Sequence, residues 1–185
     1  MDAVTLCECF ARDGLQHESA FVPTATKRSL VERFAALGFP RVEATSYSNP
    51  KIVPQFADAS ELLRSLERKP GVRYKATCAN VRAVERALAD LDAGFGANEI
   101  SLLVSATEAH SRKNLNRSRA EQWQNIEEMV RAAKGRFRLI GTVSFARSLD
   151  GSSQLALLGT RYDLSIQKPL NFLSSTVISF SALTQ

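Results

Sequence analysis

Near its start the chain contains Val4-Thr5-Leu6-Cys7-Glu8-Cys9-Phe10, which passes directly into Ala11-Arg12-Asp13-Gly14-Leu15-Gln16. The first segment is an apolar run of the length of a buried strand, so we predict a strand over residues 4–10. Arg12 and Asp13 then lie at the exit of a strand, with a loop and an amphipathic helix after them. In proteins built from alternating strands and helices, catalytic groups are usually placed there. A surface ion pair at a turn is an equally good interpretation of these two residues alone.

The same pattern of strand followed by helix repeats along the chain as far as about residue 145. Short apolar runs bounded by Gly, Pro or polar residues predict further strands at residues 41–45, 72–77, 99–104 and 137–145. Helical spacing of apolar residues predicts helices between them, beginning at the candidate caps Thr24 or Thr26, Asp58, Asn80 and Ser118. Residues 105–117 are predicted to form a long polar loop.

Five strands alternating with four helices, in units of roughly 30 residues, predict an α/β fold with a parallel sheet. An open doubly wound sheet and part of a (β/α)8 barrel both fit this alternation. The chain lacks a glycine-rich dinucleotide-binding motif, which slightly disfavours the open sheet. A length of 185 residues is most simply one domain.

From residue 148 onward the pattern changes. Residues 148–185 are rich in Ser, Thr and Leu, hold few charged residues, and offer only possible strands at 155–158 and 176–180. We therefore divide the chain into a region of about five βα units, residues 1–147, and an atypical C-terminal tail, residues 148–185.

Composition excludes several classes of function. The net charge is +5, but the basic residues are scattered among glutamates, so we expect no nucleic-acid partner and prefer a small phosphorylated molecule. No apolar run reaches the roughly 18 residues of a membrane span, and we predict neither a membrane segment nor a signal peptide. Cys7, Cys9 and Cys78 lack the spacing of a zinc site or a redox pair, which indicates core residues and a reducing, cytoplasmic setting.

The polar residues of interest collect at the carboxyl ends of the predicted strands, which in parallel α/β proteins converge on one rim. These residues are Arg12, Asp13, Glu43, Thr45, Ser46, Thr77, Asn80, Ser105, Glu108, His110, Lys113, Asn114 and Ser144. Asp13 is a hard oxygen ligand suited to Mg²⁺ or Mn²⁺. Arg12 can stabilise a developing oxyanion, and Glu43 can orient either of them. We interpret His17 and His110 as polar loop residues rather than ligands.

These residues resemble a known family. Arg-Asp-Gly-Leu-Gln at residues 12–16, Glu-Ala-Thr-Ser at 43–46 and Pro-Lys-Ile-Val-Pro-Gln at 50–55 are similar to the 3-hydroxy-3-methylglutaryl-CoA lyases. Further similarity lies in Ser-Ala-Thr-Glu at 105–108, Lys-Asn-Leu-Asn at 113–116 and Gly-Thr-Val-Ser at 141–144. The resemblance covers about residues 4–146.

The resemblance implies part of a (β/α)8 TIM barrel that cleaves a 3-hydroxy-3-methylacyl-CoA to acetyl-CoA and a 3-oxo acid, with help from a divalent cation. By this match Asp13 is a metal ligand, Arg12 stabilises the thioester enolate and Glu43 supports the site. Gln16 is expected to line the substrate site, together with Ser46, Asn80 and Lys113. An acyl-CoA partner and a place in leucine degradation follow, and a homo-oligomer is compatible with the match.

The chain departs from the family in ways that bear on activity. It lacks the family's His-x-His pair and its late glycine-rich loop with a catalytic cysteine, and the similarity stops abruptly after residue 146. We therefore expect a truncated or frame-shifted chain that is inactive alone, with strand edges and an apolar face exposed. One alternative is a non-catalytic half-barrel that binds a CoA-type anion or a partner subunit. A weaker one is a Claisen-type acyl-CoA synthase of the same group.

Overall fold

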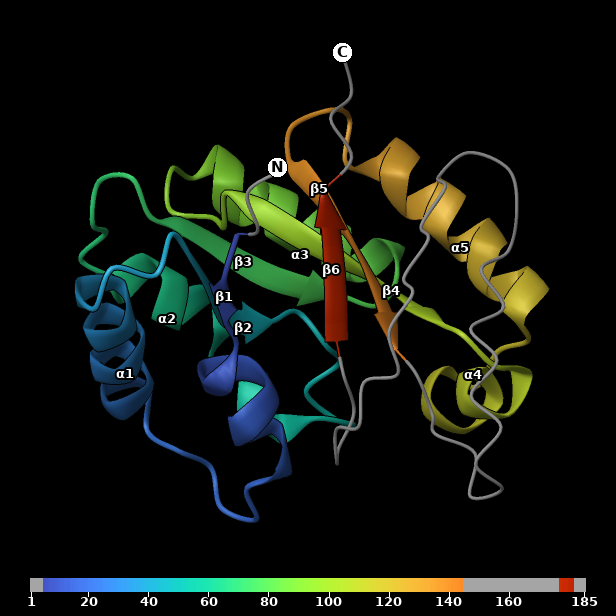
Figure 1. Cartoon of the computed structure of the whole chain (residues 1–185), viewed down its shortest axis with the longest axis horizontal. Coiled ribbons are helices and arrows are strands. Elements are labelled where there is room, and N and C mark those ends of the chain that lie inside the picture. Colours follow the sequence, from blue (N-terminus) through green and yellow to red (C-terminus); the bar gives the residue numbers. More distant parts are fainter. Residues whose placement is uncertain (1–4, 145–176, 182–185) are drawn as a thin grey trace.

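A curled sheet forms the centre of the molecule in the computed structural model, which describes residues 5–144 and 177–181 (Figure 1). Five strands follow one another in chain order and run parallel, and a sixth pairs antiparallel with the fifth. They are β1 (Cys7–Glu8), β2 (Arg41–Ser46), β3 (Arg73–Cys78), β4 (Glu99–Ser105), β5 (Arg138–Ser144) and β6 (Val177–Ser181). The predicted partial (β/α)8 barrel is thus confirmed as a half-barrel.

Helices surround the outer face of the sheet (Figure 1). They are α1 (Thr24–Ala36), α2 (Ala59–Ser65), α3 (Val81–Asp92), α4 (Glu108–Leu115) and α5 (Arg119–Ala132), with short turns η1 (Phe10–Gly14), η2 (Leu15–His17) and η3 (Pro54–Phe56). The described part of the chain has no helix that is both long and apolar enough to cross a bilayer.

Two of the predicted caps are confirmed. The Asn80 side chain accepts a hydrogen bond from the backbone N–H of Ala83 at the start of α3. Ser118 and Glu121 form a reciprocal capping box at the start of α5. These caps satisfy backbone donors that have no partner inside the helix, and therefore fix where each helix begins.

The predicted cap at Thr24 or Thr26 is wrong, and Asp58 occupies the predicted capping position without making a capping hydrogen bond. Pro23 occupies the capping position of α1, and the Thr24 hydroxyl instead donates to the carboxylate of Asp58 at 2.8 Å. Asp58 precedes α2, but its side chain does not bond to the start of that helix. Its other oxygen accepts from the buried Lys27 ammonium at 2.7 Å. A contact between two helices has thus replaced a local cap.

Two further predictions need correction, and one about the C-terminal tail is confirmed. The first strand is much shorter than predicted, because Phe10 already belongs to the turn η1. The predicted loop at 105–117 contains α4, which is capped by Thr107. The possible strand at 176–180 is present as β6, whereas the one at 155–158 and the proposed boundary at 147 lie outside the described residues.

Alternate side chains of each strand point to opposite faces of the sheet, and the two faces differ in polarity. On the outer face, Val42, Tyr74 and Ile100 are buried in the apolar core beneath the helices. On the inner face, polar side chains pair with one another, as Ser101 and Thr142 do across β4 and β5. The expectation of an exposed apolar face is therefore wrong for the inside of this half-barrel.

The amino ends of the strands are joined by one buried carboxylate. Glu99 is fully buried, and its oxygens lie 2.5 Å from Arg41 Nε, 3.2 Å from Arg73 Nη1 and 3.6 Å from Arg138 Nε. These arginines come from β2, β3 and β5, so one acidic side chain links four neighbouring strands. The cluster lies at the opposite end of the sheet from the predicted site.

A candidate active site at the carboxyl ends of the strands

A tight turn presents Arg12 and Asp13 immediately after β1. The backbone N–H groups of both residues donate to the carbonyl oxygen of Cys9, at 3.0 Å and 2.7 Å. Arg12 Nη1 lies 2.9 Å from Asp13 Oδ1. The side chain of Arg12 is 15% exposed and that of Asp13 is 49% exposed, so the pair is half inside the protein. The simple interpretation as a surface ion pair therefore describes only Asp13.

Glu43 anchors the buried side of Arg12. Arg12 Nε lies 3.7 Å from Glu43 Oε1, and Lys75 Nζ lies 3.0 Å from Glu43 Oε2. The Thr77 hydroxyl also donates to Oε1. Burial alone would raise the pKa of Glu43, but the charges of Lys75 and Arg12, with the Thr77 hydrogen bond, hold it below its usual value. Glu43 is therefore charged near neutral pH, and its carboxylate attracts the guanidinium of Arg12 from the buried side.

Arg12, Asp13 and Glu43 thus come together as the sequence predicts, and Thr77 lies with them at the strand ends, but Lys75 was not predicted. The sequence indicates only that a lysine in the middle of a strand buried on both faces needs a partner of opposite charge. The partner is set by register, since Glu43 and Lys75 lie opposite each other in β2 and β3. Burial lowers the pKa of Lys75, but Glu43 more than offsets this and raises it above the ordinary value.

Ser46 and Gln16 lie near this cluster in different surroundings. Ser46 ends β2 and is fully buried, and its Oγ lies 2.7 Å from Ser48 Oγ and 3.3 Å from the carbonyl oxygen of Thr77. Gln16 is half-buried in η2, directly after the turn that carries Arg12. Ser46 is therefore linked to the Glu43 cluster through Thr77.

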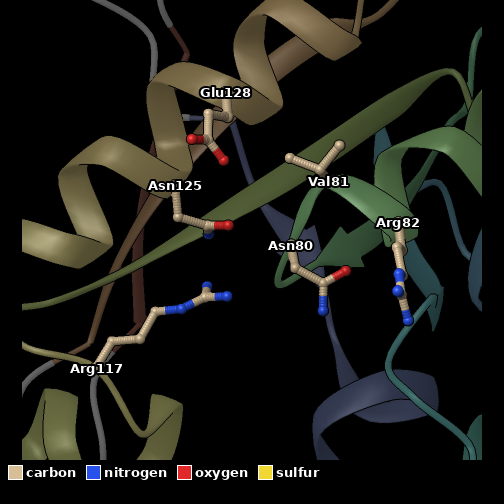
Figure 2. Close-up of a pocket in the computed structure, with 6 residues that line it drawn as sticks. All are labelled: Asn80, Val81, Arg82, Arg117, Asn125 and Glu128. Carbon is tan, nitrogen blue, oxygen red and sulfur yellow. The ribbon is translucent and has the colours of Figure 1, made fainter.

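Asn80 borders a surface hollow of about 330 Å³ between the starts of α3 and α5. Arg82, Arg117, Asn125 and Glu128 also line it, and Figure 2 shows Arg117 and Asn125 pointing into it from one side with Asn80 opposite. Two arginines and one glutamate line the hollow, so its net charge favours an anion. Arg82 and Arg117 were not predicted, because a lone arginine beside a cap carries no distinct sequence signal.

Lys113 and His110 belong to the unpredicted helix α4. Lys113 is exposed, and His110 Nδ1 lies 2.9 Å from Ser105 Oγ at the end of β4. Burial, together with the charge of Lys113, lowers the pKa of His110. Lys113 therefore stands at the rim on a helix, apart from the Glu43 cluster. Ser144 ends β5, as predicted.

The donor set of this site does not amount to a cation site. Among the described residues, no three His, Cys, Asp or Glu side chains lie together in a way that could hold a metal ion. Asp13 offers one half-exposed carboxylate, already paired with Arg12, and Glu43 is neutralised by Lys75. Mg²⁺ and Mn²⁺ need about six ligands, so these residues do not bind one by themselves.

Parallel strands in a curled sheet, helices outside and ionisable groups at the carboxyl ends define a (β/α)-barrel protein of the enzyme type. Comparison with known proteins gives the family. Residues 3–156 match the HMGL-like family, which generally depends on a divalent metal, and the chain belongs to that family.

Relatives of known activity agree with this assignment. The mitochondrial hydroxymethylglutaryl-CoA lyase of Rattus norvegicus is 38% identical over 131 residues, which cover 71% of this chain and 39% of the relative. The cytoplasmic 3-hydroxy-3-methylglutaryl-CoA lyase of Danio rerio is 40% identical over 71% of this chain and 38% of its own length. The chain thus spans about two fifths of the relatives it matches.

Solved structures agree as well. The HMG-CoA lyase from Brucella melitensis superposes with a TM-score of 0.70 at 38% identity, over 77% of this chain and 49% of that one. The HMG-CoA lyase from Acinetobacter baumannii, solved in complex with coenzyme A and 3-methylmalate, gives a TM-score of 0.69 at 31% identity, over 77% and 47%. The resemblance to the carbon–carbon lyases seen in the sequence is therefore confirmed.

Proposed function

We propose that the Arg12 cluster is the first half of a hydroxymethylglutaryl-CoA lyase site, which binds an acyl-CoA and stabilises the enolate formed on cleavage. The observation that carries this proposal is the position of Arg12 in the turn after β1, where its guanidinium forms an ion pair with Glu43 on the buried side and with Asp13 on the exposed side. A fixed cation at the point where negative charge develops lowers the barrier without reorganisation.

The chemistry that Arg12 would assist is a retro-Claisen cleavage. A base takes the proton of the C3 hydroxyl, whose oxygen becomes the ketone of the 3-oxo acid as the carbon–carbon bond breaks. The electron pair of that bond stays on the acetyl thioester, delocalised onto its oxygen as an enolate, which is then protonated to acetyl-CoA. Arg12 would donate hydrogen bonds to that oxygen, and Glu43 would keep the guanidinium in place. Gln16, Ser46, Asn80 and Lys113 would bind the rest of the acyl-CoA from the same rim.

Asp13 is our candidate for a ligand to Mg²⁺ or Mn²⁺, on the grounds of its hard oxygen donors and its half-exposed position. Because one carboxylate does not complete such a site, we assign no step to the ion. We also propose that the described half-barrel alone does not turn substrate over. We place the function in the cytoplasm and in leucine degradation, in keeping with three free thiols.

A second candidate function is a non-catalytic half-barrel that binds a CoA-type anion. The hollow at Asn80 supports it, since Arg82 and Arg117 present two guanidinium groups to a ligand of phosphate type. This candidate needs no contribution from Arg12.

Calorimetric titration with 3-hydroxy-3-methylglutaryl-CoA, with and without Mn²⁺, separates the two functions. We expect binding that weakens at least tenfold in Arg12→Gln and is unchanged in the control Arg131→Gln, an exposed arginine on α5. Loss of binding in Arg82→Gln with no effect of Arg12→Gln would favour the second function. Equal binding by all variants would overturn both. A parallel assay for acetyl-CoA release tests the expected lack of turnover.

A further inference from the structure

Two thiols touch each other beside the turn that carries Arg12. Cys7 lies in β1 and Cys9 follows it by two residues, and their Sγ atoms are 3.7 Å apart. Cys9 Sγ also lies 3.6 Å from the carbonyl oxygen of Cys7. Both residues are half-buried, so small reagents can reach them, whereas Cys78 is fully buried. Cys78 is thus a core residue as predicted, whereas Cys7 and Cys9 are not.

The backbone explains why the two thiols meet. Alternate residues of a strand point to the same face, so Cys7 and Cys9 share a side. At Cys9 the chain bends, with φ −126° and ψ 0°, as β1 gives way to η1. A disulfide needs a sulfur–sulfur distance of about 2.05 Å, so the sulfurs must approach by roughly 1.6 Å from where they stand.

The two sulfurs are already close enough to touch, and both residues are half-buried. Either thiol can therefore be the one that attacks an oxidant, and the other can then resolve the oxidised sulfur.

We propose that Cys7 and Cys9 form a thiol pair that hydrogen peroxide converts to an intramolecular disulfide. The thiolate of one cysteine attacks one peroxide oxygen, the O–O bond breaks, and the departing hydroxide takes up a proton to become water. The sulfur of the other cysteine then attacks the resulting sulfenic acid, and a second water leaves as the S–S bond forms. Overall two thiols lose two hydrogens and two electrons, and one peroxide is reduced to two waters.

Disulfide formation acts on the Arg12 turn through Cys9. The carbonyl oxygen of Cys9 accepts hydrogen bonds from the backbone N–H groups of both Arg12 and Asp13. A movement of Cys9 therefore moves the start of η1. Oxidation therefore displaces Arg12 from Glu43, and the effect on ligand binding rests on the function proposed above. The disulfide itself does not depend on that function.

Mass spectrometry of the full chain tests the pair. After peroxide treatment, alkylation and proteolysis, we expect a peptide that is lighter by two hydrogens, with Cys7 and Cys9 both protected from alkylation and restored by dithiothreitol. Cys7→Ser and Cys9→Ser should each lose this product, while Cys78→Ala retains it. Full alkylation of both thiols after oxidation, stable sulfinic acid at either cysteine, or disulfides only between chains would overturn the proposal.

A second measurement separates the pair from its consequence. If the proposed function holds, titration with 3-hydroxy-3-methylglutaryl-CoA should show at least tenfold weaker binding to the oxidised chain, and oxidation should leave Cys9→Ser unaffected. If the disulfide forms but the oxidised chain binds the ligand as tightly as the reduced chain, the link to Arg12 would be overturned. Absence of binding in both states tells against the proposed function, and the mass result then decides the thiol pair on its own.

Discussion

Replacing Lys75 by methionine removes the main partner of a buried carboxylate. The side chain of Lys75 is 1% exposed and that of Glu43 is 5% exposed, and their charged atoms lie 3.0 Å apart. Methionine keeps the length of the lysine stem but not its charge. Glu43 then retains only Arg12, at 3.7 Å, and the Thr77 hydroxyl.

The size of the effect follows from this geometry. Two unit charges at 3.0 Å attract by roughly 5 kcal/mol at an effective dielectric constant of about 20. Removing one partner of a buried pair usually costs about 3–5 kcal/mol, because an uncompensated charge stays behind. Since Arg12 and Thr77 still compensate part of the charge, we expect a loss of about 3 kcal/mol in the free energy of unfolding at pH 7.

The loss should depend on pH. In the parent chain the pKa of Glu43 is lowered, so its stabilisation is complete above the unfolded value near 4.5 and disappears only as the pH falls through the lower folded value. Without Lys75, burial dominates and the pKa of Glu43 rises above the unfolded value. Such a group stabilises below the unfolded pKa and loses this as the pH rises. The cost of Lys75→Met should therefore be smaller at pH 4 than at pH 7.

Urea unfolding followed by far-UV circular dichroism, at pH 4 and pH 7, measures both effects. Lys51→Met is the matched control, because Lys51 is exposed, and it should change stability by less than about 0.5 kcal/mol. The double variant Glu43→Gln, Lys75→Met should recover part of the loss, since no buried charge is then left alone. A cost below about 1 kcal/mol for Lys75→Met, or one equal at both pH values, would refute the role given to this pair.

Three further substitutions test other parts of the structure. Ser118→Ala removes the capping box with Glu121 and should cost about 1 kcal/mol by thermal unfolding, and no change would show that the cap is unimportant. Tyr47→Phe removes the hydroxyl that donates to the buried Asp90 at 2.7 Å and should cost about 1–3 kcal/mol in urea, whereas a neutral result would mean that water replaces it. Leu62→Ala empties a fully buried site under α2 and should cost about 2–5 kcal/mol; a smaller loss would indicate that the core collapses around it.

The elements predicted well are those whose signals are local. Asn80 and Ser118 each bond to the first turn of the helix that follows, and both helices begin where these residues predict. Helix α4 was missed because it is short and polar and shows no apolar stripe, so that its only local signal was Thr107 at the cap. The first strand was predicted too long, because an apolar Phe10 does not reveal that the chain turns there.

The candidate site divides in the same way. Arg12 and Asp13 could be predicted because they follow a strand directly, and a strand exit is recognisable from the chain itself. The contact of Glu43 with Lys75 could not, because it depends on the register of β2 against β3. Register is set by packing of the whole sheet, and residues 32 positions apart carry no local mark of their pairing.

The charges around Arg12 form a series that alternates in sign, from Lys75 through Glu43 and Arg12 to Asp13. Its inner end is buried between β2 and β3, and only its outer end, the half-exposed carboxylate of Asp13, reaches solvent. The guanidinium of Arg12 is therefore positioned by residues that also stabilise the sheet. A substitution that loosens β2 against β3 should change ligand binding at Arg12 as well as stability, whereas a substitution at Asp13 should change binding alone. Stability and ligand binding are therefore coupled at Lys75 and Glu43, the inner end of the series, and are independent at Asp13, its outer end.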